Sequence, residues 1–120
     1  MHYVLRMDVK LGSQMEQYMN LLAARQKLVA SNIANAETPG YHAKDIDFQF
    51  EFQSLAATYG PEAKPHVIEA PGLKERNDGN NVSMDREMRL LSENALRFQF
   101  VSQLMKNQFQ QYRRAIQSPR

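Results

Sequence analysis

Cysteine is absent from this sequence of 120 residues. Its absence excludes disulfide bonds, thiolate metal sites and cysteine nucleophiles. No apolar run approaches the ~18 residues that a membrane-spanning helix needs, so direct membrane insertion is not expected. Charges at Arg6, Asp8 and Lys10 interrupt the N-terminal stretch and leave no apolar core for a cleavable signal peptide. We therefore expect the chain to stay in the cytoplasm or to leave it by a route that reads no cleaved signal.

A large excess of either charge is also missing. Fifteen Lys and Arg residues stand against thirteen Asp and Glu residues, which gives a net charge of +2. Proteins that bind nucleic acids are usually far more basic, so the composition argues against a nucleic-acid partner.

Groups of residues that could carry out catalysis or hold a metal are also lacking. The three histidines, His2, His42 and His66, are widely separated and have none of the short spacings of zinc sites, so we interpret them as surface or loop residues. Asp45 and Asp47 would point the same way from a strand and could form an acid/base or metal pair. With no converging partners in the sequence, we interpret them instead as a solvated strand face. The sequence predicts no enzyme, no cofactor, no metal and no small-molecule substrate.

Apolar residues at helical spacing mark the first third of the chain. They are Met15, Tyr18, Leu22, Val29 and Ile33. We expect a helix from about Ser13 to Ala36, and Pro39-Gly40 then suits the centre of a type II turn.

The clearest periodic signal lies between residues 84 and 116. Apolar positions alternate four and three residues apart, and Ser102 is the one exception among them. The members of this seam are Met84, Met88, Leu91, Ala95, Phe98, Ser102, Met105, Phe109, Tyr112 and Ile116. Such a 3.5-residue period predicts a helix about 50 Å long that packs as a coiled coil. We expect the seam to contact both the first helix and neighbouring subunits.

A second apolar strip widens this helix. Its members are Leu96, Phe100, Val101 and Leu104. We expect Leu96, Phe100 and Leu104 to face other subunits.

The segment between the two helices contains the breakers Pro61, Pro65, Pro71 and Gly72. Alternation over residues 45–52 favours an extended segment with an aromatic face, although a helix from near Phe48 stays possible and the state of residues 45–57 stays open. Residues 66–69 are expected to form a short strand. The predicted fold is mainly α: residues 1–36 and 83–120 form a discontinuous, coiled-coil-like helical domain, and 37–82 form an irregular, short-β connection.

The stretch from Ala30 to Tyr41 reads ASNIANAETPGY and resembles the ANIANxxTPGY signature of the flagellar rod and hook axial proteins. The residues of this turn motif singled out by the resemblance are Asn32, Asn35, Thr38, Pro39, Gly40 and Tyr41. Three later blocks resemble the B-type proximal rod subunits within that family: KDIDF at 44–48, DGNNVSMDRE at 78–87 and NALRFQ at 94–99. Phe98 takes the place of the family's usual tyrosine.

This resemblance implies a structural subunit of the rod, which lies in the periplasm as part of the basal body. Its terminal helices would self-assemble around the export channel, and the flagellar type III system would export it without cleavage. The implied partners are other copies, other rod proteins and the MS-ring or export-gate adaptors at the rod base. A helical-hairpin adaptor or chaperone of the export system is the alternative, although it would not need the turn motif.

Overall fold

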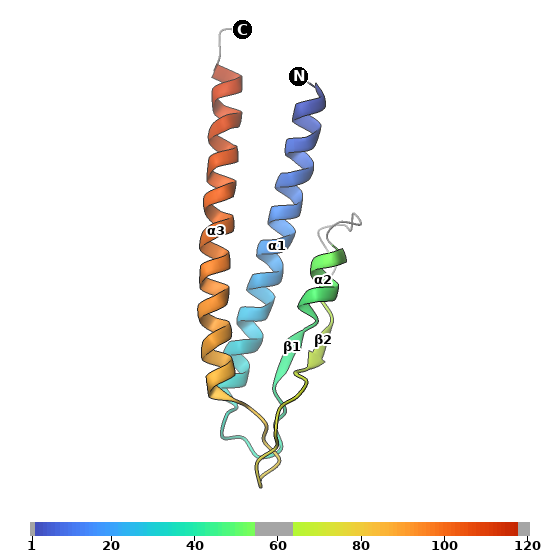
Figure 1. The fold of residues 1–120 in the computed structure, drawn as a ribbon, viewed down its shortest axis with the longest axis vertical. Helices are drawn as coiled ribbons and strands as arrows, with labels where there is room; N and C mark the ends of the chain where they lie inside the picture. Colours follow the sequence, from blue (N-terminus) through green and yellow to red (C-terminus); the bar gives the residue numbers. More distant parts are fainter. Residues whose placement is uncertain (1, 55–63, 118–120) are drawn as a thin grey trace.

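A computed structural model describes residues 2–54 and 64–117, with the backbone alone described for residues 2–9. Two long helices, α1 (His2–Ala34) and α3 (Met84–Gln117), run antiparallel and place both termini at the same end (Figure 1). Between them lie β1 (Lys44–Ile46), α2 (Phe48–Ser54) and β2 (Val67–Glu69). The molecule measures 69 × 24 × 18 Å. This arrangement confirms the predicted mainly helical fold with paired terminal helices and a short β segment.

Helix α1 begins at His2, well before the predicted start near Ser13. The prediction was wrong because a charged N-terminal stretch is compatible with an exposed helix, and a single glycine such as Gly12 costs a helix only about 1 kcal/mol. The helix ends at Ala34, where the amide of Asn35 still donates to the carbonyl of Ser31 at 3.0 Å.

Helix α3 matches its prediction closely, ending one residue later than expected. Ser83 caps its start, since its Oγ accepts a hydrogen bond from the backbone N–H of Arg86 at 3.3 Å. Asp85 and Glu87 lie in the first turn and Arg114 in the last, so their charges complement the helix dipole at both ends.

The connecting segment is part strand and part helix. β1 pairs antiparallel with β2, with Asp45 opposite Ile68, and this confirms the predicted strand near residues 66–69. The extended alternation does not continue to residue 52, because Asp47 caps α2: its Oδ1 accepts a hydrogen bond from the N–H of Phe50 at 3.2 Å. The end of the segment left open, residues 55–57, lies outside the described residues.

Two small groups of apolar side chains make the core. The first consists of the buried apolar residues of the two long helices: Met15, Leu21, Leu22 and Val29 on α1 and Leu90 and Val101 on α3. The second lies beneath the turn that follows α1 and consists of Ala43, Ala70 and Val82, with Ala36, Tyr41 and Leu73 packed against them. The axes of α1 and α3 diverge toward the chain termini (Figure 1).

Candidate functional site

The turn motif that follows α1 forms the closed end of the molecule. Gly40 adopts a φ of +76°, which L-residues with side chains rarely adopt, and its N–H donates to the carbonyl of Asp78 at 2.9 Å. Gly79 lies against it, and a Cβ on Gly79 would come within 3.3 Å of the Cα of Gly40. The two glycines therefore allow the turn and the later loop to touch backbone to backbone.

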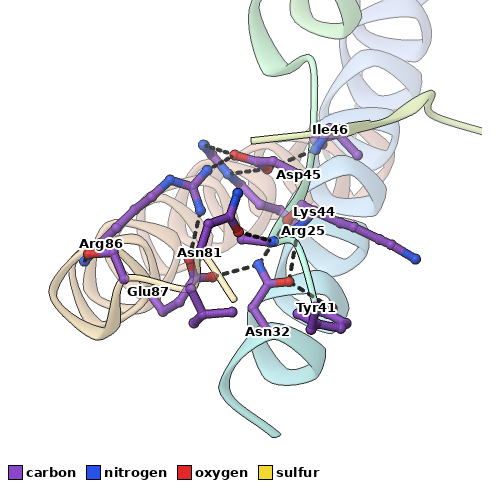
Figure 2. A network of polar contacts seen from close by, with 12 residues as sticks. Arg25, Asn32, Tyr41, Lys44, Asp45, Ile46, Asn81, Arg86 and Glu87 are labelled. Carbon is purple, nitrogen blue, oxygen red and sulfur yellow. Dashed lines mark hydrogen bonds and ion pairs between the residues drawn. The ribbon is translucent and has the colours of Figure 1, made fainter. Parts of the chain in front are cut away.

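Asn32 is fully buried at the centre of this end (Figure 2). Its Nδ2 donates to the carbonyl of Lys44 and to Oε1 of Glu87, both at 2.8 Å. Its Oδ1 accepts from the N–H of Lys44 and from the hydroxyl of Tyr41, both at 3.0 Å. One amide side chain thus uses its full hydrogen-bonding capacity to join α1, the turn, β1 and α3.

Two other members of the motif close the turn itself. Nδ2 of Asn35 donates to the carbonyl of Ser31 at 2.9 Å, as expected for an amide that satisfies a helix end, and Thr38 donates to Asn35 at 3.1 Å. Tyr41 packs back on its own helix through its bond to Asn32.

Four charged side chains lie on one side of Asn32 and extend the contact between elements (Figure 2). The carboxylate of Asp45 accepts a bidentate pair from Arg25 at 3.1 and 2.9 Å and a third bond from Arg86 at 2.5 Å. Arg86 also donates to Glu87 at 2.7 Å. Two guanidinium groups therefore balance two buried carboxylates. Among the described residues, no buried side-chain nitrogen or oxygen lacks a hydrogen-bond partner.

The predicted solvated face at Asp45 is therefore wrong, since this side chain is buried and only Asp47 is exposed. The sequence pattern could not reveal this burial, because the partners of Asp45 lie 20 and 41 positions away in the chain. The available signal for this burial was that the KDIDF and MDRE blocks both contain charged residues, among them Asp45 and its partner Arg86.

The asparagines of the later loop hold it to the turn motif. Asn80 is fully buried, and its Nδ2 donates to the carbonyls of Asn35 and Thr38 at 2.9 and 2.8 Å. Asn81 accepts the N–H of Ala43 at 2.6 Å. The sequence indicated only a loop at this point. In the structure, its two asparagine side chains bond to residues about forty positions earlier in the chain.

The face of α3 that packs on α1 lies one position away from part of the predicted seam. The buried residues of α3 are Glu87, Leu90, Asn94 and Val101. Asn94 donates to the carbonyl of Leu22 at 2.8 Å and to Oε1 of Gln26 at 3.2 Å. Two of the four buried positions are thus polar, and a search for apolar residues at regular spacing passed over them.

Several seam residues consequently do not pack inside the single chain. Met84, Met88, Phe98, Phe109 and Ile116 are 42–78% exposed. Ala95 is exposed as well, and Leu91, Ser102, Met105 and Tyr112 are half-buried. Within one copy, the contact of these exposed members with the first helix therefore stays a prediction. Their expected contact with other subunits stays a prediction.

Part of the seam instead lines an open groove of about 820 Å³ between α1 and α3. Its walls are Leu22, Ala23 and Gln26 from α1 and Leu91, Asn94, Ala95, Phe98, Gln99 and Ser102 from α3. None of these side chains is charged. The strip of Leu96, Phe100 and Leu104 lies elsewhere on α3 and is 67%, 66% and 42% exposed.

Known proteins resemble this chain over most of its length. A family model described as flagella basal body rod protein matches residues 19–42, which contain the second half of α1 and the turn motif. Flagellar basal body rod protein FlgB of Salmonella typhimurium is 35% identical over 78% of this chain and 83% of its own length. FlgB of Escherichia coli K12 is 32% identical over 94% of this chain and 96% of its own length. The chain belongs to the FlgB family of flagellar basal body rod proteins.

Membership of the FlgB family confirms the resemblance drawn from the sequence motifs. The family is a structural part of the flagellar rod and not a family of enzymes, and it locates the chain in the basal body. Where the structure describes side chains, in residues 10–54 and 64–117, no three His, Asp or Glu residues are placed to hold a metal ion. Over the same part of the chain, neither long helix is apolar enough to cross a membrane.

The geometry gives the FlgB-family motif a physical role. Residues 19–42 include Asn32, Asn35 and Tyr41, whose side chains fix the exit of the chain from α1. They also include Arg25, which binds Asp45. The matched segment therefore contains the residues of α1 that tie this helix to β1 and to the start of α3.

Proposed function

We propose that this chain is a self-assembling subunit of the proximal rod, held in the axial drive shaft around the export channel by its two terminal helices. In this proposal, residues 1–36 and 83–120 form the axial part, and residues 37–82 form the connection outside it. Its partners are other copies, other rod proteins and the adaptors of the MS ring or export gate at the rod base.

The observation that carries the proposal is the amount of apolar surface on α3. Eight of the thirteen large hydrophobic side chains that are exposed in the described part of the chain belong to this helix: Met84, Met88, Leu96, Phe98, Phe100, Leu104, Phe109 and Ile116. An apolar surface of this extent is typical of a protein interface. The buried network at the turn supports the same proposal, since it holds α1 and α3 at a fixed angle for packing into a lattice.

Fractionation of cells tests this proposal. A deletion strain complemented with the tagged chain is grown to motility, and its basal bodies are purified and probed for the tag. We expect the chain to co-purify with basal bodies and to restore swimming. A chain found only in the cytosol, in cells whose basal bodies are complete, would contradict the proposal and favour the adaptor of the export system.

We also propose that the chain is exported by the flagellar type III system without cleavage. Membership of a family of flagellar basal body rod proteins supports this, because the rod lies outside the cytoplasm. The N-terminal sequence of the chain taken from purified basal bodies tests it. We expect that sequence to begin at Met1 or His2, and a start further along would contradict export without cleavage.

A further inference from the structure

Two apolar surfaces occupy opposite sides of α3. The first is the groove with α1, to which α3 contributes Leu91, Ala95 and Phe98. The second is the outer strip, defined as Leu96, Phe100 and Leu104. Ala95 and Leu104 are nine positions apart, and at about 100° per residue they point about 180° apart around the helix. The groove and the outer strip therefore lie on opposite sides of one helix.

The two surfaces match in length and polarity. The groove runs from Leu91 to Ser102, about 16 Å along the helix, and the outer strip covers about 12 Å. No charged side chain lines the groove, and the outer strip is wholly apolar. The amide of Asn94 is already bonded to Leu22 and Gln26, so this polar group does not need water from the open groove. Covering the groove with an apolar strip therefore buries no charge and leaves this amide satisfied.

We propose that the outer strip of one copy docks in the groove between α1 and α3 of the next copy. This inference rests on the proposed function and names the contact by which copies join. A copy cannot fill its own groove, because both surfaces belong to one continuous helix and face opposite ways. The contact uses two different patches, and such a heterologous contact continues from copy to copy instead of closing into a two-fold dimer.

The absence of native cysteine makes a direct cross-linking test possible. Ala95→Cys places a thiol in the groove, and Leu104→Cys places one on the outer strip. In basal bodies from motile cells that carry both substitutions, a short bismaleimide linker is expected to produce dimers, trimers and longer multiples of this chain. Ser102→Cys with Leu96→Cys is an independent pair with the same expectation, in case one substitution disturbs folding.

Single variants and a displaced pair are the controls. Ala95→Cys alone and Leu104→Cys alone are expected to give no dimer, and neither is Ala95→Cys with Gln53→Cys, whose second thiol lies on α2. Dimers from Ala95→Cys alone would indicate a two-fold contact and overturn the inference. Failure of both test pairs to cross-link in motile cells would also overturn it, while the proposed function would stand. Absence of the wild-type chain from basal bodies would instead contradict the proposed function.

The identity of the cross-linked neighbour is tested separately. A photoactivatable phenylalanine analogue in place of Phe100 attaches to any chain that covers the outer strip. We expect a product of twice the mass of the chain, with the attachment site at residues 22–26 or 91–102. A product that contains a different protein and no second copy would overturn the inference.

Discussion

The two ends of this molecule differ in whether a single copy supplies all the contacts that its side chains need. At the turn, buried polar groups such as Asn32, Asp45 and Glu87 all have partners within the chain. Along the second half of α3, apolar groups such as Phe100, Phe109 and Ile116 are 64–78% exposed. Buried polar groups without partners are costly, and at the turn none of these groups needs a neighbouring copy to supply a partner. Exposed apolar groups still gain free energy when a neighbour covers them.

The largest expected effect comes from a charge placed on the exposed apolar surface of α3. Phe98→Asp should abolish swimming, because assembly would bury an unpaired carboxylate in the groove. Expression and folding of the single chain should be retained, since Phe98 is 47% exposed in it. Motility in soft agar and a urea denaturation curve of the purified chain measure the two effects.

Gln110→Asp is the matched control for this prediction. It adds the same charge to an exposed position of α3 that lies beyond the last groove residue, Ser102, and beyond the outer strip, which ends at Leu104. This variant should swim. Normal swimming of Phe98→Asp would contradict the assignment of the groove to assembly.

A substitution in the buried polar network at the turn should instead lower the stability of the single chain. Asp45→Asn leaves Arg25 and Arg86 with one carboxylate between them, that of Glu87. Removing one partner from a buried ion pair costs about 3–5 kcal/mol of the free energy of unfolding. The urea midpoint of the purified chain measures this loss.

Asp47→Asn, two residues further on, controls for the loss of a negative charge. Asn is as good a helix cap as Asp, so this variant should change the free energy of unfolding by less than about 0.5 kcal/mol. Equal stability of the two variants would show that the buried cluster does not hold the turn together.

These contrasts also separate what the sequence could predict from what it could not. The span of α3 was predictable because a heptad period is a local property of the chain. Which face of α3 is buried was not predictable, because Glu87 and Asn94 are buried against partners 55 and 72 positions away in the chain. Resemblance identified Asn32 and Tyr41 as important, whereas only the structure gave them a common role, in which the tyrosine hydroxyl donates to the amide that links the elements.

A smaller effect is expected from two glycines in different backbone conformations. Gly40→Ala should destabilise the chain by about 1–2 kcal/mol, because its φ of +76° strains a residue with a Cβ. Gly12→Ala should stabilise α1 by about 0.5–1 kcal/mol, since Gly12 lies inside a helix with open space around it. Thermal unfolding of both variants tests these opposite signs, and a stabilising Gly40→Ala would contradict the described turn.

The smallest expected effect is a pH dependence at the turn. His42 contacts Glu75 at 2.8 Å and Glu69 at 3.4 Å, and the hydrogen bond with Glu69 is the main cause that raises the pKa of His42 above 6.5. A raised pKa in the folded state means that this contact stabilises the chain below pH 6.5 and that the stabilisation is lost as the pH rises through the folded-state pKa. Melting temperatures from pH 5 to 8 should fall slightly in the wild type and by less in His42→Gln. An equal fall in both would contradict this role of His42.

Hydrogen exchange on the free subunit and on the assembled rod tests the contrast between the two ends most directly. In the free subunit, we expect slow exchange around Asn32, Ala43 and Leu90, and fast exchange from Ser102 to Gln117. In the assembled rod, Ser102 to Gln117 should become protected, because neighbouring copies cover it. Strong protection across residues 84–116 in the free subunit, without any oligomer, would contradict the account.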